Sequence, residues 1–320
     1  MDIVFSINNK YVEHLVVVLC SICENTQDSC NFYIINKDIS VKNIEIIQNF
    51  IKCYKNKNIQ FIRINDNFIE KCPINQKQQN KDITVETYFR LFLTDLLPKT
   101  LNKVIYLDCD IIVRINLQEL WNIDVSDYAI AGVLDTLTSD YKTYNRLKYL
   151  PKYGYINAGI LLINLEFWRK NKVIENFKDI ILTIPDMLQF HDQDVLNLSF
   201  YDKKLILPFK FNYHEGLVRK ELSILYTYWD EIYKTEMNPS IIHYSGSIKP
   251  WHKNCPNPYL QEFFKYKKKT PFCNSCLQKL KQPIKLKIKF FLKVCFAFTK
   301  LCNPPLDRKT LYRKVSISKD

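Results

Sequence analysis

Short apolar runs alternate along the first part of this chain with longer stretches in which apolar residues recur at helical spacing. Strand-like runs occur at Asp2–Ile7, Asn31–Ile35 and Gln60–Ile64. Between them, Tyr11–Glu24 and Val41–Ile51 have the pattern of helices, the second with a single apolar face. Because parallel strands need a long crossover connection, this alternation predicts a largely parallel sheet flanked by helices.

The same alternation continues to about Lys265, where the predicted α/β domain ends. The further strands that we expect cover 103–113, 128–134, 158–164 and an apolar lead-in at 240–242. The further helices that we expect cover 84–97, with Thr84 as N-cap, then 167–183 and 192–200.

Composition supports a folded domain and excludes some classes of site. The chain has 320 residues, of which 47% are hydrophobic and 14% aromatic, enough for a substantial core and too many for a wholly disordered protein. It has only five glycines. Neither a P-loop nor a glycine-rich dinucleotide fingerprint occurs, so the sequence offers no glycine-built phosphate cradle.

The net charge of +13 is concentrated at the C-terminus. Residues 265–320 hold 16 of the 46 Lys and Arg residues and two of the 33 Asp and Glu residues, a net charge of +14 against −1 for the rest. Lys281, Lys285, Lys289 and Lys293 recur every four residues, so a helix would carry them as one stripe opposite apolar residues such as Phe291. This pattern is typical of a helix that lies on an anionic membrane surface.

Two other interpretations of the basic tail remain open. The tail could be a C-terminal helix packed on the domain with its lysines in solvent, or a nucleic-acid-binding arm. Arginine is scarce there and the apolar residues cluster, so we expect no nucleic-acid partner. The predicted division is a domain over 1–265 and a basic amphipathic, membrane-associating tail over 266–320.

The eleven cysteines raise the question of disulfides and metal sites. No leader with a basic start and an apolar run precedes the first strand, and no segment has the length and apolarity of a membrane span. We therefore expect reduced, cytosolic cysteines. Cys20 and Cys23 lie on an apolar helical pattern and are expected in the core. Cys273 and Cys276 could form half of a zinc site, but no second pair of matching spacing follows.

The stretch most informative about chemistry is 103–113, which reads KVIYLDCDIIV. Side chains two positions apart in a strand share a face, so Asp108 and Asp110 should leave the sheet together at or just past a strand end. Ionised carboxylates in an apolar strand need compensation, for which a hard divalent cation carrying phosphate oxygens is well suited. The ordinary alternative is a solvated turn.

A second informative stretch is 243–252, which reads HYSGSIKPWH. His243 offers an imidazole, a good ligand for a transition metal. Gly246 allows the backbone to turn or to approach a ligand, and Lys249 provides a mobile positive charge for phosphate. The next two residues, Pro250 and Trp251, should stiffen and anchor the loop.

Polar residues also stand at the ends of other predicted elements. Asp135 follows a strand, Asn157 precedes one, and Asp192 and Gln193 open a helix. Such residues are most often caps or turns, and Asp192 has the position of an N-cap. Tyr11, directly after the first strand region, could stack on a nucleobase or simply pack at the start of a helix.

These ordered motifs resemble glycosyltransferase family 8, and within it the bacterial lipopolysaccharide galactosyl- and glucosyltransferases. The resemblance runs from Asp2 to about His252. It implies a GT-A fold, a Rossmann-like and mostly parallel sheet flanked by helices. It also implies transfer from a UDP-sugar with retention of the anomeric configuration, dependent on Mn²⁺ (or Mg²⁺). Asp108, Asp110 and His243 match the family's metal ligands.

The resemblance also assigns donor-binding and catalytic positions. Arg90 matches an arginine that reaches the diphosphate and sugar, whereas a surface arginine is the ordinary alternative. Asn8 stands where close relatives have an aspartate that contacts uracil, although an amide can still bond to that base. The implied donor-binding residues are Asn8, Tyr11, Arg90, Asp108, Cys109, Asp110, Asn157, Gly246 and Lys249. The implied catalytic residues are Asp135, Asp192, Gln193 and Lys249.

Gln193 lies at the family position below the anomeric carbon of the donor. A neutral amide is a poor nucleophile, so a front-face transfer with an electrostatically stabilised UDP leaving group fits better. The interpretation is a hexosyltransferase that moves galactose or glucose onto a lipopolysaccharide, lipooligosaccharide or other lipid-linked acceptor at the inner face of the cytoplasmic membrane. A metal-dependent nucleotidyltransferase, which would need a third carboxylate instead of His243, and a non-catalytic nucleic-acid-binding protein are the alternatives.

Overall fold

The computed structural model describes residues 1–65, 86–219, 228–253 and 255–279. A seven-stranded sheet forms its centre, in the order β3-β2-β1-β4-β7-β6-β8, and β5 pairs with β9 in a second small sheet. The strands are β1 (Asp2–Ile7), β2 (Cys30–Asn36), β3 (Lys57–Arg63), β4 (Lys103–Leu107), β5 (Ile111–Val113), β6 (Ile130–Leu134), β7 (Ile156–Asn164), β8 (Lys204–Ile206) and β9 (Ile241–His243).

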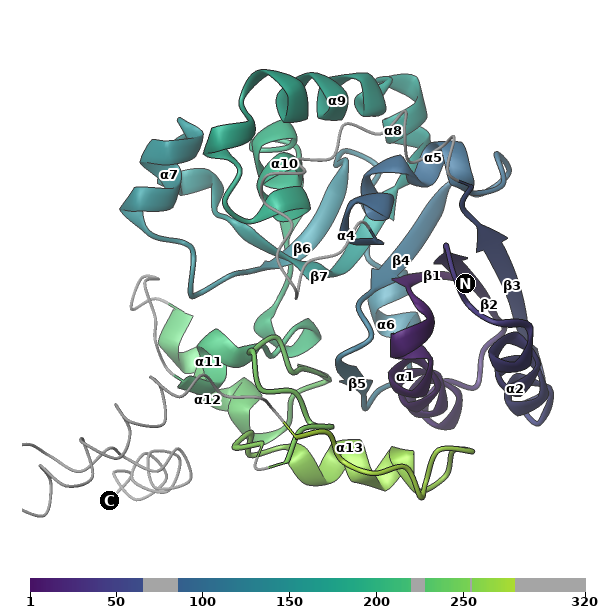
Figure 1. The fold of residues 1–320 in the computed structure, drawn as a ribbon. Coiled ribbons are helices and arrows are strands. Elements are labelled where there is room, and N and C mark those ends of the chain that lie inside the picture. The colour runs from purple at the N-terminus through teal and green to yellow at the C-terminus, as the bar shows by residue number, and fades with distance from the viewer. Residues whose placement is uncertain (66–85, 220–227, 254, 280–320) are drawn as a thin grey trace, which may run out of the picture.

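Helices cover both faces of the central sheet, with α1 and α2 on one side and α5, α8 and α9 on the other (Figure 1). The α-helices are α1 (Val12–Asn25), α2 (Val41–Lys52), α4 (Glu86–Phe89), α5 (Leu93–Leu96), α6 (Gln118–Trp121), α7 (Tyr141–Leu147), α8 (Leu165–Lys170), α9 (Val173–Thr183), α10 (His191–Ser199), α11 (Glu215–Arg219), α12 (Trp229–Met237) and α13 (Leu260–Lys267). The short 3₁₀ helices are η1 (Asn9–Tyr11), η3 (Arg90–Phe92), η4 (Pro151–Tyr153), η5 (Pro185–Met187) and η6 (Phe209–Phe211).

The predicted, mostly parallel sheet is confirmed. The pairs β1–β2, β1–β4, β2–β3 and β6–β8 are parallel, whereas β7 runs antiparallel to both β4 and β6. Because β7 is reversed, it begins at the edge of the sheet where β1, β4 and β6 end. The residues that follow β1, β4 and β6 and the residues that begin β7 therefore lie at the same edge.

The core consists of two apolar layers, one on each face of the sheet. In β1, Ile3 and Phe5 pack in the layer with α1, whereas Val4 packs in the layer with α9. In β7, Ile160 and Leu161 divide between the layers in the same way. The near-continuous apolar runs in the sequence are thus strands that are buried on both faces, as expected for such sheets.

Two helices predicted as continuous are divided in the structure. The expected helix 84–97 is wrong as one element: α4, η3 and α5 replace it, and Thr84 lies outside the described residues. Residues 88–93 are all buried, and a regular α-helix would turn some of them toward solvent. The expected helix 167–183 is also wrong, because Lys172 adopts a left-handed conformation (φ 48°) and separates α8 from α9.

The expected strand 103–113 is likewise interrupted. β4 ends at Leu107, and the chain resumes as β5 at Ile111 in the second sheet. Asp108 and Asp110 occupy the break, so the prediction that both carboxylates leave at the end of a strand is confirmed. The break also separates two pairings: β4 remains in the central sheet, whereas β5 pairs with β9.

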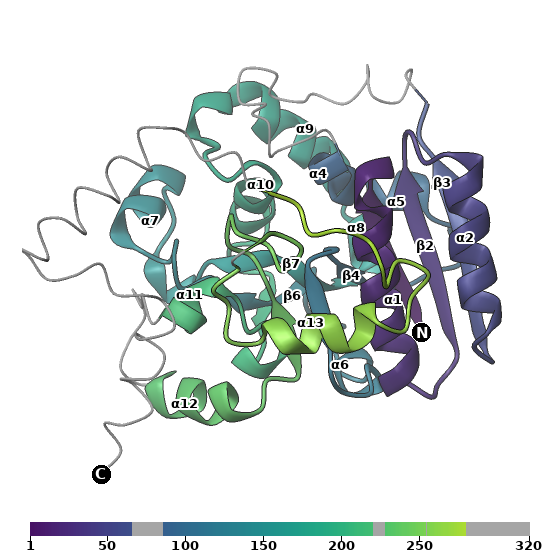
Figure 2. The same cartoon turned by 60° about the horizontal axis from the view of Figure 1, so that its bottom comes forward.

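Residues 266–279 contact the domain on the N-terminal side of the predicted boundary. The Lys267 ammonium lies 3.0 Å from the Glu13 carboxylate of α1, and Ser275 donates a hydrogen bond to the same carboxylate. Asn25 at the end of α1 donates to the Tyr266 hydroxyl at 2.8 Å. In Figure 2, α13 runs across α1 and meets it at one end. The predicted basic helix that carries Lys281–Lys293 lies outside the described residues.

In the described part of the chain, every helix is too short or too polar to cross a membrane.

Candidate active site

The polar residues singled out in the sequence meet at one edge of the central sheet. β1 delivers Asn8, β4 delivers Asp108, and β6 delivers Asp135 at their carboxyl ends. The reversed strand β7 begins there and contributes Asn157 from its second position. Two backbone hydrogen bonds close the edge, from Asp108 to Gly159 (2.8 Å) and from Asp135 to Tyr155 (2.8 Å). Ligands of open α/β sheets commonly bind at such an edge.

Three possible metal ligands converge at the break between β4 and β5. Pairing of β5 with β9 sets Ile111 opposite His243, and the Tyr244 amide donates to the Asp110 carbonyl at 2.8 Å. One ligand atom from each of Asp108, Asp110 and His243 lies within 4.8 Å of the others. Two oxygens and an imidazole nitrogen form this group. A third carboxylate, which a nucleotidyltransferase would need, is replaced here by His243.

The charges around the two aspartates are unequal. Burial would raise the pKa of Asp110, but Lys249 and His243 outweigh it and hold the pKa well below its usual value. The Lys249 ammonium lies 2.5 Å from Asp110. Burial raises the pKa of Asp108, against the lowering effect of Arg90. Asp108 therefore lacks full compensation by protein groups, which favours an added cation at this place.

His243 is oriented as a metal ligand. Its Nδ1 is 2.9 Å from the Asn212 side-chain oxygen, and its Nε2 is 3.3 Å from Asp110. Metal-binding histidines commonly donate one ring N–H to a neighbouring acceptor and offer the other nitrogen to the ion. The donor set therefore fits a hard or borderline divalent cation such as Mn²⁺.

Arg90 is buried and joins two carboxylates, so the ordinary interpretation as a surface arginine does not hold. Its Nη2 donates to Asp108 at 3.0 Å, and its Nε lies 2.9 Å from Asp192. The guanidinium also lies over the Tyr106 ring, 4.4 Å from its centre. These contacts hold the arginine beside the possible metal ligands and leave it charged.

Asp135, Asn157 and Gln193 form one hydrogen-bonded cluster. A single oxygen of Asp135 accepts from the Asn157 amide (3.0 Å) and from the Gln193 amide (3.1 Å). Burial opposes ionisation of Asp135, but the nearby His214 and these two hydrogen bonds bring its pKa below the usual value. Gln193 also accepts from the Ala158 amide at 2.8 Å, so both ends of its side chain are held.

Asp192 does not cap α10, and the N-cap prediction is wrong. The helix begins at His191, its N-cap position is Phe190, and no side chain caps it. Asp192 instead faces Arg90, and burial raises its pKa to about 7 in spite of that arginine. The adjacent Asp194, which the sequence did not single out, accepts hydrogen bonds from Arg146, Tyr155 and the Phe190 amide.

The residues expected near the nucleobase lie where β1 meets α1. The Asn8 side-chain oxygen accepts from the Lys10 amide at 3.1 Å and so caps η1. Tyr11 lies in η1, so the helix predicted from Tyr11 begins one residue later. The Tyr11 ring meets Trp251 edge to face, with centres 6.1 Å apart. Trp251 is buried and stacks on His14 at 3.5 Å, which confirms the expected anchoring of the loop.

The Lys249 loop contacts the group of possible metal ligands. Besides Asp110, the Lys249 ammonium bonds to the Tyr244 carbonyl at 2.9 Å, and the Lys249 amide donates to His252. A Cβ on Gly246 would lie 3.0 Å from the Glu215 carboxyl carbon, so this glycine allows a close approach to Glu215. Cys109 is buried between the two aspartates.

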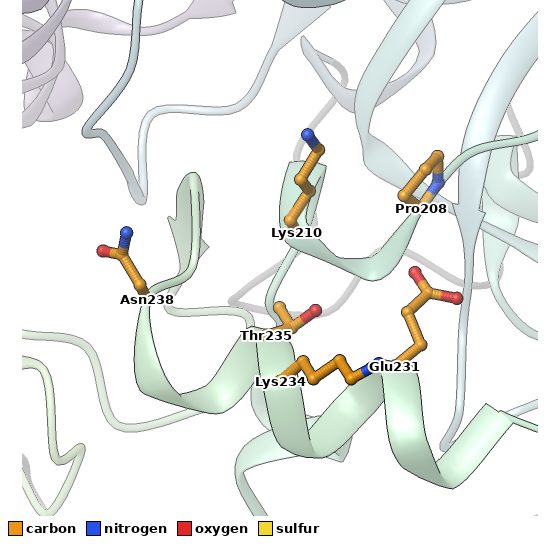
Figure 3. Close-up of a pocket in the computed structure, with 6 residues that line it drawn as sticks. All are labelled: Pro208, Lys210, Glu231, Lys234, Thr235 and Asn238. Carbon is orange, nitrogen blue, oxygen red and sulfur yellow. The ribbon is translucent and has the colours of Figure 1, made fainter.

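A separate pocket lies between η6 and α12 (Figure 3). Its lining comprises Pro208, Lys210, Glu231, Lys234, Thr235 and Asn238. None of the residues that gather at the sheet edge lines this pocket, and Glu231 accepts a hydrogen bond from the Phe209 amide at 2.7 Å. We therefore place the site at the sheet edge.

Three further residues belong to the site and are not among those predicted from the sequence. Asn212 bonds to His243, Asp194 is fully paired behind Gln193, and Gly159 faces His243. Asn212 lies between Phe211 and Tyr213, and a polar residue between two aromatic ones was a usable signal, whereas Asp194 stands among other polar residues and carried none. Nothing in the sequence indicated that β7 would run beneath His243.

Comparisons with known proteins agree with this geometry. The model of glycosyl transferase family 8 matches residues 2–255. A Haemophilus influenzae protein is 32% identical over 259 residues, 80% of this chain and 74% of its own length. An Escherichia coli lipopolysaccharide 1,2-glucosyltransferase is 30% identical over 257 residues, 78% of this chain and 73% of its own length.

A solved structure shares the fold. The crystal structure of the galactosyltransferase LgtC with donor and acceptor sugar analogs has a TM-score of 0.75 and 26% identity, over 90% of this chain and all of that one. The predicted GT-A fold is thereby confirmed. Together, the family match and the relatives show that this chain is a glycosyltransferase and belongs to family 8.

Proposed function

We propose that this glycosyltransferase transfers a hexose, galactose or glucose, from a UDP-sugar with retention of configuration and with dependence on Mn²⁺. The observation that carries the proposal is the convergence of Asp108, Asp110 and His243 beside Lys249 at the carboxyl edge of the sheet. A diphosphate is the anionic ligand that such a combination of cation site and lysine would suit.

Different residues of the chain would contribute different charges to the binding of the donor. Asp108, Asp110 and His243 would hold the cation, which when bound supplies positive charge to the departing diphosphate. Lys249 is already within the site and needs only to exchange Asp110 for a phosphate oxygen. Arg90 places a second, buried positive charge beside Asp108. Most of the rate acceleration is then electrostatic and positional.

Retention is supported by the hydrogen bonds of Gln193. Both ends of its amide are used, by Asp135 and by the Ala158 amide, so its oxygen is not directed as a nucleophile. We infer a front-face transfer, in which the acceptor hydroxyl enters on the side from which UDP departs. The Asp135 carboxylate is ionised and suited to accept a sugar hydroxyl.

The donor base is the first property to test. With Mn²⁺, UDP should bind at least about tenfold more tightly than ADP, a difference of about 1.4 kcal/mol. The reason is that Asn8, with its oxygen used in the η1 cap, presents its amide nitrogen to a uracil oxygen. Tyr11→Ala removes the ring and should weaken the binding of UDP by about 1–3 kcal/mol, because the stacking on the base is lost. Titration calorimetry measures both effects.

Tyr141→Ala is the matched control, because Tyr141 is a strongly exposed tyrosine on α7. It should leave UDP affinity unchanged. Equal affinities for UDP and ADP in the parent enzyme would contradict the assignment of a UDP-sugar donor.

The acceptor is the second part of the proposal. Because the relatives include lipopolysaccharide glucosyltransferases, we propose a lipopolysaccharide, lipooligosaccharide or other lipid-linked saccharide. The basic segment 266–320 would hold the enzyme peripherally at the anionic inner face of the cytoplasmic membrane. Residues up to Gln278 contact the domain. We therefore place the start of the membrane-facing part after Lys279.

Truncation after Lys279 tests the anchor. It removes 11 Lys and Arg residues and two aspartates but spares the contacts of Lys267 and Ser275. The full chain should sediment with anionic vesicles and be partly released by salt, because screening weakens the electrostatic attraction but not apolar insertion. The truncated enzyme should stay in the supernatant.

UDP affinity of the truncated enzyme serves as its folding control and should equal that of the full chain. If both forms partition alike onto the vesicles, the segment after Lys279 is not an anchor.

A further inference from the structure

A line of four side chains connects the proposed sugar site to the proposed metal site. It runs from Asp135 through Asn157 and Asn212 to His243. The successive contacts measure 3.0, 3.0 and 2.9 Å. All four side chains are buried, with Asn212 at 0% exposure. Buried polar chains of this kind are costly unless every member is paired, so the direction of each hydrogen bond matters.

The direction of the hydrogen bonds follows from Asp135, the end whose polarity is known, and from the Gly159 amide. The ionised Asp135 only accepts, so Asn157 must present its amide nitrogen to it. The Asn157 oxygen then faces Asn212, and the same oxygen accepts the backbone N–H of Gly159 at 3.0 Å, which independently requires an oxygen there. Both observations give Asn157 one orientation.

The orientation of the Asn212 amide follows from that of Asn157 and determines which nitrogen of His243 carries the proton. Since the Asn157 oxygen accepts, Asn212 must donate with its nitrogen, and its own oxygen therefore faces Nδ1 of His243. An amide oxygen cannot donate, so Nδ1 must carry the proton. While Nε2 also carries a proton, it donates to Asp110, 3.3 Å away; once the ring is neutral, Nδ1 keeps its proton and Nε2 is the nitrogen that can bind a cation.

We infer that Asn212 is a positioning residue that keeps the proton of the neutral His243 ring on Nδ1 and so leaves Nε2 for the metal. The inference rests on the proposed metal site and adds to it the residue that prepares the third ligand. Asn212 itself touches neither metal nor donor. Asp135 sets the polarity from the other end, so one carboxylate orients both Gln193 in the sugar site and His243 in the metal site.

The tautomer is measurable in the parent enzyme without metal. Long-range ¹⁵N–¹H correlation spectra, recorded at a pH high enough to keep the ring neutral, should show His243 protonated at Nδ1 and unprotonated at Nε2. The chain has only five histidines, so His243→Gln assigns the signal. A ring protonated at Nε2 would overturn the inference, whatever the enzyme's activity.

Variants then test the role of Asn212 in metal affinity. Asn212→Ala should weaken Mn²⁺ binding by about 10–100-fold, the usual effect of losing an outer partner of a metal ligand. Asn212→Asp keeps an acceptor for Nδ1–H but loses the donor to Asn157, so it should retain more of the affinity than Asn212→Ala does. Titrations in which electron paramagnetic resonance detects free Mn²⁺ measure the affinity of both variants without an activity assay.

The control is Asn197→Ala. Asn197 is as buried as Asn212 and bonds to β7 and to the Gln193 carbonyl, but it lies outside the chain to His243. Its variant should keep the parent's Mn²⁺ affinity. Parent-like Mn²⁺ binding by Asn212→Ala would contradict the inference and leave the proposed function intact, whereas absence of Mn²⁺ binding in the parent would contradict the proposed function itself.

Discussion

Asp110→Asn should lower kcat/KM for the UDP-sugar by about 10³-fold, comparable to the loss of a main electrostatic stabiliser in other enzymes. Asp110 is the carboxylate on which Lys249 and His243 converge, at 2.5 and 3.3 Å. An amide at this place keeps the size and removes the charge, so the cation and the lysine lose their common partner. Steady-state kinetics with saturating Mn²⁺ measure the loss.

Asp124→Asn is the matched control for this change. Asp124 is exposed and precedes β6, so it lies at the edge of the sheet opposite the site. Its variant should keep parent kinetics. Retention of full activity by Asp110→Asn would remove Asp110 from the metal assignment.

Gly159→Ala should disrupt the proposed metal site with one added methyl group. A Cβ at this position would overlap Cε1 of His243 and lie 3.0 Å from the Asp108 carboxylate. Neither neighbour is free to withdraw, because Asn212 holds the ring of His243 and Arg90 holds Asp108. We expect Mn²⁺ affinity to fall by at least about 100-fold, the upper range for perturbed ligand positioning.

Gly132→Ala provides the comparison, since an added Cβ there meets the side chains of Ile156 and Leu161 in the core. It should destabilise the fold by about 1–3 kcal/mol, as overpacking does, without changing Mn²⁺ affinity. If Gly159→Ala lowers thermal stability but binds Mn²⁺ as the parent does, the close packing of His243 on β7 is not functional.

The sequence predicted the strands better than the helices. β1, β2 and β7 follow apolar runs that are buried on both faces, a pattern that depends little on distant contacts. The division of α8 from α9 depends on the left-handed conformation of one residue, Lys172, and the sequence around it does not predict that conformation. The reversed direction of β7 was also hidden, because strand polarity depends on the topology of the whole sheet.

The candidate site was predictable where a motif carried its chemistry. Asp108, Asp110 and His243 each stood out as polar residues attached to apolar strands, and the structure brings them together. The position of Asp192 in the sequence is that of a helix cap, whereas its partner Arg90 is 102 residues away along the chain, which is why the prediction of a cap is wrong. The role of Asn212 could not be predicted, since it depends on a hydrogen-bond chain that joins four separate segments.

Turnover of UDP-sugars tests the central claim most directly. UDP release should be measured from UDP-galactose, UDP-glucose and, for comparison, ADP-glucose, each with Mn²⁺ and again with excess EDTA. We predict release from at least one UDP-hexose with Mn²⁺, loss of that release in EDTA with recovery on adding Mn²⁺, and no comparable release of ADP. Undiminished UDP release in EDTA, or equal turnover of ADP-glucose, would contradict a metal-dependent UDP-sugar transferase built on Asp108, Asp110 and His243.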